Sequence, residues 1–577
     1  MSRVSQVVNE QPRKNRETLA NGVTMKVDIS SLQKARAKYK PKLPASLLNG
    51  ANVELRYGEK TQSIADQEKI EALFPSTYGL PIITFNNKIL GNPSKAVNIG
   101  VVLSGGQAPG GHNVVAGLFD GIKSLHQNSK LFGFLGGPGG LVDNKYIEIT
   151  ADFLEGYRNT GGFDIIGSGR TKLERTEQFD AAARNCDALG INAIVIIGGD
   201  DSNTNACLLA EYYEGKHILI QVIGCPKTID GDLKNAHIEA SFGFDTACRV
   251  YSELIGNLQR DAISSKKYWH FIKLMGRSAS HITLECALQT HPNITLIGEE
   301  VAHRKMTLID IVNDMASVIA KRAEKGKNYG IVLVPEGLIE FIPEMNILIG
   351  ELNEIMAEKH EAFKPQDEKL HFLVGKLSPE SAKTYLTLPH EIRHQLMMDR
   401  DPHGNVQVSR IDTEKLMMEM IEVRLNALKS EGKYKGKFSS LNHFFGYEGR
   451  CSAPSNFDAD YCYGLGYTAA ALVGAGKTGY MSSVRNLTKP ETEWIAGGIP
   501  ITMMMNVERR HGEDKPVIQK ALVDLDGNPF KELLKSRESW ASEDHFVYPG
   551  PIQYFGPPEV CDVVTFTLAL EHDKSNS

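Results

Sequence analysis

The feature that most constrains this fold is an apolar run that ends abruptly in two glycines and two carboxylates. Residues 193–197 are Ala-Ile-Val-Ile-Ile, and GGDDS follows at 198–202. A short apolar run bounded by glycine is typical of a strand buried on both faces, as in a parallel sheet. Ligands bind outside the carboxyl ends of such strands. For this motif alone, a strand-to-helix turn with an Asp or Ser cap is the alternative.

Similar runs recur along the chain. Strand-like stretches are predicted at 97–103, 164–167, 218–224, 269–274 and 330–334, and helical patterns at 114–126 and 179–189 separate the first of them. This alternation is the pattern of parallel strands joined by crossover helices, so we expect an α/β fold.

Two regions depart from the alternation. Residues 1–95 form an N-terminal extension with helical patterns at 31–48 and 66–74. Between about 340 and 440, strand-like runs nearly vanish and amphipathic stretches appear at 347–363 and 413–430. We therefore expect a mostly helical insertion there. A chain of 577 residues is expected to hold more than one domain.

Composition excludes several classes of function. The net charge of −6 gives no basic footprint for nucleic acid or an anionic membrane. No stretch approaches the roughly 18 apolar residues of a membrane span, and the N-terminus lacks the apolar core of a signal peptide. The eight cysteines and 17 histidines show no zinc-ligand spacing, which indicates a cytoplasmic protein with reduced thiols.

The first phosphate-binding candidate is the glycine-rich loop after residues 97–103. Ser104, Gly105 and Gly106 precede a helical pattern, so backbone N–H groups and a helix N-terminus can face an anion. The loop matches neither the dinucleotide fingerprint nor the Walker loop. Taken alone, a structural turn is equally compatible with it.

The second candidate is PKTIDGD at 226–232. Asp230 and Asp232 stand at i and i+2, on one side of a loop that we expect to be extended. One carboxylate can act as a base toward a hydroxyl, which is the main demand of phosphoryl transfer besides positioning and charge neutralisation. An Asx turn is the alternative, and Lys227 favours catalysis because it can stabilise charge on a phosphoryl group.

Three further charged residues follow predicted strands. Arg170 can contact phosphate bidentately, Arg277 adds a second arginine, and Glu336 supplies a carboxylate for sugar hydroxyls. Each alone is compatible with a solvated surface charge. Their shared position at strand ends favours a common site.

Together these motifs resemble the phosphofructokinase family. GGDDS, PKTIDGD, SFGFDTA at 241–247, MGR at 275–277, PEG at 335–337 and GYEGR at 446–450 occur in the family's order over residues 96–577. The long-form, pyrophosphate-dependent branch is most similar. Residues 399–409 and 496–500 and the N-terminal extension also resemble that branch.

The resemblance implies two doubly wound, Rossmann-like parallel-sheet domains with the site between them. Residues 96–240 plus about 450–500 are expected to bind pyrophosphate and Mg²⁺. Residues 241–449 plus about 501–577 are expected to bind fructose 6-phosphate and to contain the helical insertion. The chain would cross between the domains near 240 and 450.

The resemblance also implies residue roles. Asp230 is expected to be the base for the 1-hydroxyl of fructose 6-phosphate, assisted by Asp232 and Lys227, and Asp200 is expected at Mg²⁺. The pyrophosphate residues would be Gly105, Gly106, Arg170, Lys172, Asp201 and Lys227. The sugar-phosphate residues would be Thr228, Asp230, Asp232, Met275, Gly276, Arg277, Glu336, Tyr447 and Arg450. Many relatives have histidine where Tyr447 stands, and tyrosine can still donate a hydrogen bond.

Two residues decide the expected donor. ATP-using relatives have glycine at the positions of Asp201 and Lys227. A carboxylate at 201 would oppose an α-phosphate, and a lysine at 227 can meet the free end of pyrophosphate. The expected products are fructose 1,6-bisphosphate and phosphate, made by a homodimer or higher homo-oligomer.

Three alternative functions have less support from the sequence. An ATP-dependent phosphofructokinase is disfavoured by Asp201 and Lys227. A non-catalytic regulatory subunit should have lost carboxylates from GGDDS or TIDGD, and this chain retains them all. An NAD or lipid kinase with a GGD loop does not account for MGR, PEG and GYEGR.

Overall fold

The larger of the two main sheets has a parallel centre and antiparallel edges. The computed structural model describes residues 29–90, 95–357, 373–397, 406–510 and 513–573. Strands β12, β7, β6, β3 and β4 are parallel to one another. The sheet order is β1 (Val53–Lys60), β2 (Pro81–Ile89), β13 (Ile495–Pro500), β12 (Tyr480–Arg485), β7 (Gln221–Pro226), β6 (Ala193–Gly198), β3 (Ile99–Leu103), β4 (Leu131–Phe134) and β5 (Tyr146–Ile149).

Helices cover both faces of this sheet because successive strand residues point to opposite sides. Val101 and Leu103 of β3 share one apolar core with residues of α4 (Gly111–Leu125) and α20 (Asn456–Gly474). Val102 shares another with residues of α7 (Thr176–Ala188) and α8 (Asp200–Gly215). The expected doubly wound arrangement is confirmed, and it explains why these strands are apolar throughout.

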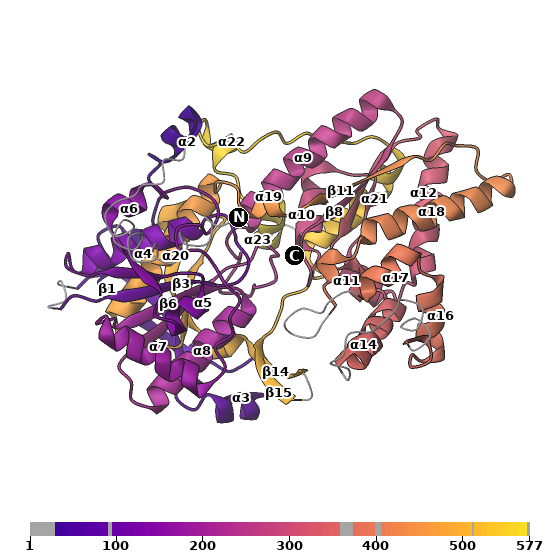
Figure 1. Cartoon of the computed structure of the whole chain (residues 1–577). Helices are drawn as coiled ribbons and strands as arrows, with labels where there is room; N and C mark the ends of the chain where they lie inside the picture. Colours follow the sequence, from indigo (N-terminus) through magenta and orange to yellow (C-terminus); the bar gives the residue numbers. More distant parts are fainter. Residues whose placement is uncertain (1–28, 91–94, 358–372, 398–405, 511–512, 574–577) are drawn as a thin grey trace, which may run out of the picture.

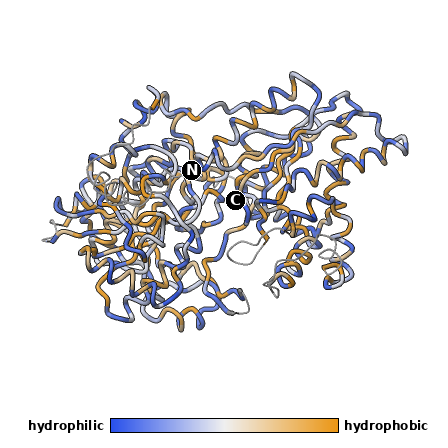
Figure 2. The backbone as a smooth tube through the Cα atoms, in the orientation of Figure 1, coloured by the Kyte–Doolittle hydropathy of each residue, from blue (hydrophilic) through white to orange (hydrophobic). Residues whose placement is uncertain are grey.

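The smaller sheet is entirely parallel and lies in the other lobe of Figure 1. Its order is β11 (Ser440–Phe445), β8 (Trp269–Leu274), β10 (Gly330–Pro335) and β9 (Ile294–Thr295). Helices α9 (Phe244–Ser265) and α10 (His281–Thr290) pack on one face, and α12 (Leu308–Glu324) and α18 (Thr413–Ser430) on the other. In Figure 2 the strands of both lobes carry hydrophobic residues, and hydrophilic stretches gather toward the outside.

Every helix or strand that the structure describes between 340 and 439 is a helix, as expected, with turns and irregular segments between the helices. Buried leucines and isoleucines of these helices continue the core of the smaller sheet. Residues 358–363 of one expected helix and 399–405 of the family motif lie outside the described residues. The elements are α13 (Leu338–Phe341), α14 (Pro343–Ala357), α16 (Pro379–Thr387), α17 (His390–Leu396), η2 (Val408–Arg410) and α18.

Several sequence expectations need correction. Residues 164–167 form a turn and not a strand. Ile165 and Ile166 are buried there, but Gly167 at φ 68° donates its N–H to the Phe163 carbonyl, which bends the chain. The expected helix over 31–48 is two short helices, α2 (Ser31–Arg36) and η1 (Ala45–Leu47). Strands β1, β2, β4, β5, β9, β11, β12 and β13 were not predicted, and neither was the hairpin over 505–518.

The C-terminal segment returns from the larger sheet to the smaller one. It comprises the hairpin β14 (Met505–Arg510) and β15 (Glu513–Ile518), then α21 (Asn528–Ser542), α22 (Pro558–Cys561) and α23 (Phe566–His572). No helix in the described ranges is long and apolar enough to cross a membrane. The other short helices are α3 (Gln67–Leu73), α5 (Pro138–Val142), α6 (Ala151–Glu155), α11 (Gly298–His303), α19 (Tyr447–Arg450), η3 (Glu491–Glu493) and η4 (Ile501–Met504).

Candidate active site

Three loops of the larger sheet meet because their strands end together. Leu103 pairs with Ile197 in register, and Gly198 pairs with Pro226. The loops that follow are the glycine-rich loop, the GGDDS turn and the PKTIDGD loop. Their convergence at the carboxyl edge of a parallel sheet is the arrangement that the sequence predicted.

The glycine-rich loop lines a cavity of about 290 Å³. Gly105 adopts φ 81°, and its N–H donates to the Gly169 carbonyl at 2.9 Å. A Cβ at Gly106 would stand 3.4 Å from Arg450 Nη1 and 4.0 Å from Arg170 Nη2. Two guanidinium groups therefore share the space beside Gly106, which is suited to a polyanion, while the N–H groups of Ser104 and Gly105 are already bonded within the protein.

The GGDDS turn begins helix α8 with two carboxylates. Gly199 is its N-cap, and Asp200 and Asp201 occupy the first turn. The Asn203 amide donates to the carbonyls of Gly198 at 2.6 Å and Gly199 at 2.9 Å, which fixes the backbone beside the carboxylates. This turn carries ordered acidic groups at the strand end, and no Asp or Ser side-chain cap is observed.

Lys227 is buried beside the glycine-rich loop, with only 6 % of the residue exposed. Its N–H donates to the Gly198 carbonyl at 2.9 Å. Its Nζ lies 3.4 Å from the position that a Cβ on Gly105 would take. Burial lowers the pKa of Lys227 to about 8, against the opposing influence of Asp230 and Asp200.

The two aspartates of the PKTIDGD loop have different surroundings. Asp230 is half-buried, and its N–H donates to Thr228 Oγ1 at 3.1 Å. Asp232 is buried, and burial together with the charges of Asp230 and Asp200 raises its pKa to about 7. The loop is a turn and not extended, because Gly231 takes φ 76°.

Hydrogen bonds join the loops that follow the strands of the smaller sheet. The Met275 N–H donates to the Phe445 carbonyl and the Glu336 N–H to the Leu274 carbonyl, both at 3.0 Å. Buried Glu336 accepts a hydrogen bond from the Gly276 N–H at 2.9 Å. The MGR and PEG motifs thus form one rigid unit at the carboxyl ends of β8 and β10.

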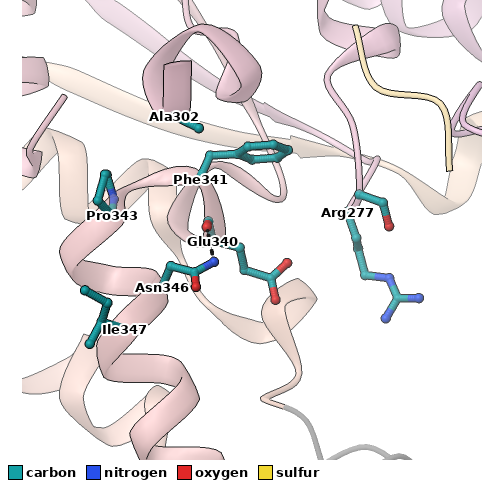
Figure 3. A pocket seen from close by; sticks show the side chains of 8 residues that line it. Arg277, Ala302, Glu340, Phe341, Pro343, Asn346 and Ile347 are labelled. Carbon is teal, nitrogen blue, oxygen red and sulfur yellow. Dashed lines mark hydrogen bonds between the residues drawn. The ribbon is translucent and has the colours of Figure 1, made fainter. Parts of the chain in front are cut away.

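Arg277 leaves this unit and faces a larger cavity of about 530 Å³. Figure 3 shows its side chain across an open space from residues of α13 and α14. Its guanidinium makes no hydrogen bond or ion pair with another described residue, so it is available to an anion. Sequence reasoning missed the opposite wall, which carries Glu340, Phe341, Asn346 and Ile347.

Tyr447 and Arg450 lie on the four-residue helix α19 after β11. The Arg450 guanidinium stands 4.5 Å from the centroid of the Tyr447 ring, a cation–π distance. Tyr447 is 57 % exposed. The structure places Arg450 beside Gly106 and Arg170, in the cavity of the glycine-rich loop, and not in the cavity that Arg277 faces.

Lys172 and Lys520 depart from the predicted set. Lys172 pairs with Glu174 at 3.4 Å, and no described contact brings it to the cavity of Arg170.

Lys520 was not predicted, yet its Nζ lies 3.6 Å from Asp200 Oδ2. Burial lowers the pKa of Lys520, but Asp200 and Asp232 outweigh burial and raise it above the ordinary value. No local motif marks Lys520, because it follows no buried strand of either sheet.

Comparison with known proteins agrees with these motifs. A family model described as phosphofructokinase matches residues 98–473. The chain belongs to the phosphofructokinase family. It is 58 % identical over 544 residues to a Porphyromonas gingivalis protein named pyrophosphate–fructose 6-phosphate 1-phosphotransferase, covering 94 % of this chain and 99 % of the relative. A Treponema pallidum protein of the same name is 56 % identical over 559 residues, covering 94 % and 97 %.

A solved phosphofructokinase structure supports the fold. The pyrophosphate-dependent phosphofructokinase of Nitrosospira multiformis superposes with a TM-score of 0.52 at 16 % sequence identity, covering 81 % of this chain and 97 % of the other. At that identity the likeness shows the fold alone. The expected pair of Rossmann-like units is confirmed.

Metal-binding groups are sparse in this phosphofructokinase. Among the described residues, no three His, Cys, Asp or Glu side chains converge on one point. Asp200 and the buried Asp232 offer carboxylate oxygens that act on the charge of Lys520, and Asp200 also acts on Lys227 at the glycine-rich loop. Mg²⁺ commonly binds through one or two carboxylates plus substrate phosphates. These two carboxylates therefore fit Mg²⁺ and do not fit a zinc ion held by protein ligands alone.

Proposed function

We propose that this phosphofructokinase transfers a phosphoryl group reversibly from pyrophosphate to the 1-hydroxyl of fructose 6-phosphate. The products are fructose 1,6-bisphosphate and phosphate. The observation that carries the choice of donor is the position of Lys227, buried against Gly105, with Asp201 at the start of α8. The two relatives named above carry the same activity in their names.

Each side chain has one task in this proposal. Asp230 removes the proton of the 1-hydroxyl, while Asp232 orients the loop beside it. Lys227 and Arg170 neutralise pyrophosphate at the glycine-rich loop. Arg277 and Tyr447 hold the sugar phosphate, with Glu336, Met275 and Gly276 forming its floor. Positioning and charge neutralisation of this kind provide most of the catalysis in phosphoryl transfer.

Mg²⁺ is the proposed cofactor, held by Asp200 together with the oxygens of pyrophosphate. When bound, it supplies positive charge that stabilises the transferring phosphoryl group. The reaction is reversible because the phosphoanhydride of pyrophosphate and the sugar phosphoester are closer in transfer potential than ATP is to either.

The two sheets suggest how the substrates divide. We propose that residues 96–240 and about 450–500 bind pyrophosphate, and that 241–449 and about 501–577 bind the sugar phosphate.

All eight cysteines are free, which supports a location in the reducing cytoplasm. We also propose a homodimer or higher homo-oligomer, which light scattering of the purified chain would test.

The experiment for the proposed function is ³¹P NMR of purified chain with fructose 6-phosphate, pyrophosphate and Mg²⁺. Equal amounts of phosphate and fructose 1,6-bisphosphate should form as pyrophosphate disappears. Starting instead from fructose 1,6-bisphosphate and phosphate, the same enzyme should make pyrophosphate. Release of phosphate without sugar bisphosphate would mean hydrolysis and would reject the proposal.

A further inference from the structure

A short C-terminal segment, residues 519–523, passes between the two sets of loops. The Ala521 N–H donates to the Asp232 carbonyl at 2.7 Å, and His281 Nε2 donates to the Ala521 carbonyl at 2.8 Å. The Val523 N–H donates to Glu299 at 3.0 Å. Asp232 belongs to a loop of the larger sheet, whereas His281 and Glu299 follow strands of the smaller one. The segment therefore bridges the donor and acceptor sides.

Lys520 stands in this segment and touches both sides with one ammonium group. Its Nζ lies 3.6 Å from Asp200 Oδ2 on α8 and donates to Ser278 Oγ at 2.6 Å. Ser278 directly follows Arg277. The Lys520 side chain is 35 % exposed, and its partner Ser278 lines the cavity that Arg277 faces, so a ligand in that cavity can approach the ammonium.

The backbone, and not this side chain, fixes the segment. The hydrogen bonds at Gln519, Ala521 and Val523 use main-chain atoms, which would be present with any residue at 520. An ion pair at 3.6 Å between partly exposed groups contributes little to stability, about 0–1 kcal/mol. A structural role therefore does not account for a lysine whose charge is directed at the Asp200 carboxylate.

We propose that Lys520 is a further catalytic residue, whose ammonium neutralises the phosphoryl group as it passes from donor to sugar. This inference rests on the proposed function. In this proposal donor and acceptor meet between the carboxyl ends of the two sheets, and the Lys520 ammonium contacts a residue from each side. A cation placed there acts on charge that develops in the transition state.

The step balances without any further reactant. The 1-hydroxyl oxygen forms a bond to the terminal phosphorus of pyrophosphate, and its proton passes to the Asp230 carboxylate. The bond from that phosphorus to the bridging oxygen breaks, and its electron pair leaves with phosphate. Lys520 keeps its proton throughout and contributes only charge and hydrogen bonds.

The test compares K520M and K520R with wild type, and uses K535M as control. Lys535 on α21 has a 75 % exposed side chain and pairs with Glu532 one turn away. Because loss of one group that stabilises transition-state charge typically costs ~10²–10³ in rate, K520M should lower kcat by that factor. KM for both substrates should stay within about threefold. K520R should recover most of the loss, and K535M should match wild type.

Two measurements separate catalysis from folding. Calorimetric binding of fructose 6-phosphate without metal and the thermal midpoint of the free protein should be the same for K520M and wild type. Wild-type kcat in K520M, or a loss of activity accompanied by lost binding or a lowered midpoint, would overturn the role of Lys520. An inactive wild type would instead reject the proposed function, and the role of Lys520 with it.

Discussion

Arg450 Nη1 lies 3.4 Å from the position that a Cβ on Gly106 would take, although the two residues follow strands of different sheets. Gly106 follows β3, and Arg450 belongs to the helix after β11. One guanidinium therefore reaches from the sugar-side loops to the donor-side loop. Its place there distinguishes Arg450 from Arg277, which faces the other cavity.

The two arginines should consequently differ in their effects. R277A should raise KM for fructose 6-phosphate by ~10²-fold and leave KM for pyrophosphate unchanged, because one charge-assisted contact provides roughly 1.5–3 kcal/mol. R450A should raise KM for both substrates. Initial rates with each substrate varied separately check this, with R304A, at the residue directly after α11, as a surface control. A purely sugar-specific effect of R450A would contradict its placement at the donor loop.

Asp230 should be essential to turnover and dispensable for binding. D230N should lower kcat by ~10²–10⁴, since it removes a positioned base while it keeps the side-chain volume. Calorimetric binding of fructose 6-phosphate should stay within a fewfold of wild type. D143N, on an exposed loop, is the control. Near-normal kcat in folded D230N would remove Asp230 from the mechanism.

Asp201 should exclude ATP through charge and volume. Like charges ~4 Å apart repel by about 4 kcal/mol at a surface-like effective dielectric, so D201G should raise kcat/KM for ATP relative to pyrophosphate. D201N keeps the side-chain volume and should raise kcat/KM for ATP relative to pyrophosphate by a smaller factor. K227G should mainly lower kcat with pyrophosphate, and D201G/K227G should favour ATP further. An unchanged donor preference in D201G would show that the selectivity arises elsewhere.

Asp232 should make the stability of the free protein depend on pH. Burial and the charges of Asp230 and Asp200 raise its pKa to about 7 in the folded state, well above the value of an unfolded Asp. Between those two values the folded protein binds the extra proton, so stability falls as pH rises from about 4 to about 7.

The D232N variant should remove that dependence. Relative to wild type it should gain roughly 2–4 kcal/mol in unfolding free energy at pH 8 and almost nothing at pH 4. Urea unfolding of metal-free wild type and D232N at both values checks this. Equal differences at the two pH values would contradict the raised pKa of Asp232.

Much of the large-sheet half of the site was predictable from sequence. Strand β6 is apolar at every position because both faces are covered, and the glycines and carboxylates that follow it mark its carboxyl end. Gly105, Lys227 and Asp230 follow strands of the same sheet. Local patterns of this kind predict where a loop lies relative to the strand that it follows.

Contacts between distant segments were not predictable. Lys520 reaches Asp200 only because the hairpin of β14 and β15 returns the chain to the site, and no local pattern records that path. Arg450, which follows a strand of the smaller sheet, reaches Gly106 of the larger one, and no local pattern predicts that contact either. The turn at 164–167 was mistaken for a strand because burial of Ile165 and Ile166 gives the same apolar signal in either conformation.

The most direct measurement is kcat/KM of the wild-type chain for pyrophosphate and for ATP, with saturating fructose 6-phosphate and Mg²⁺. Lys227 and Asp201 predict rapid formation of fructose 1,6-bisphosphate with pyrophosphate and a value at least ~10²-fold lower with ATP, since about 4 kcal/mol of repulsion opposes the α-phosphate. Equal values for the two donors, or a preference for ATP, would contradict the account.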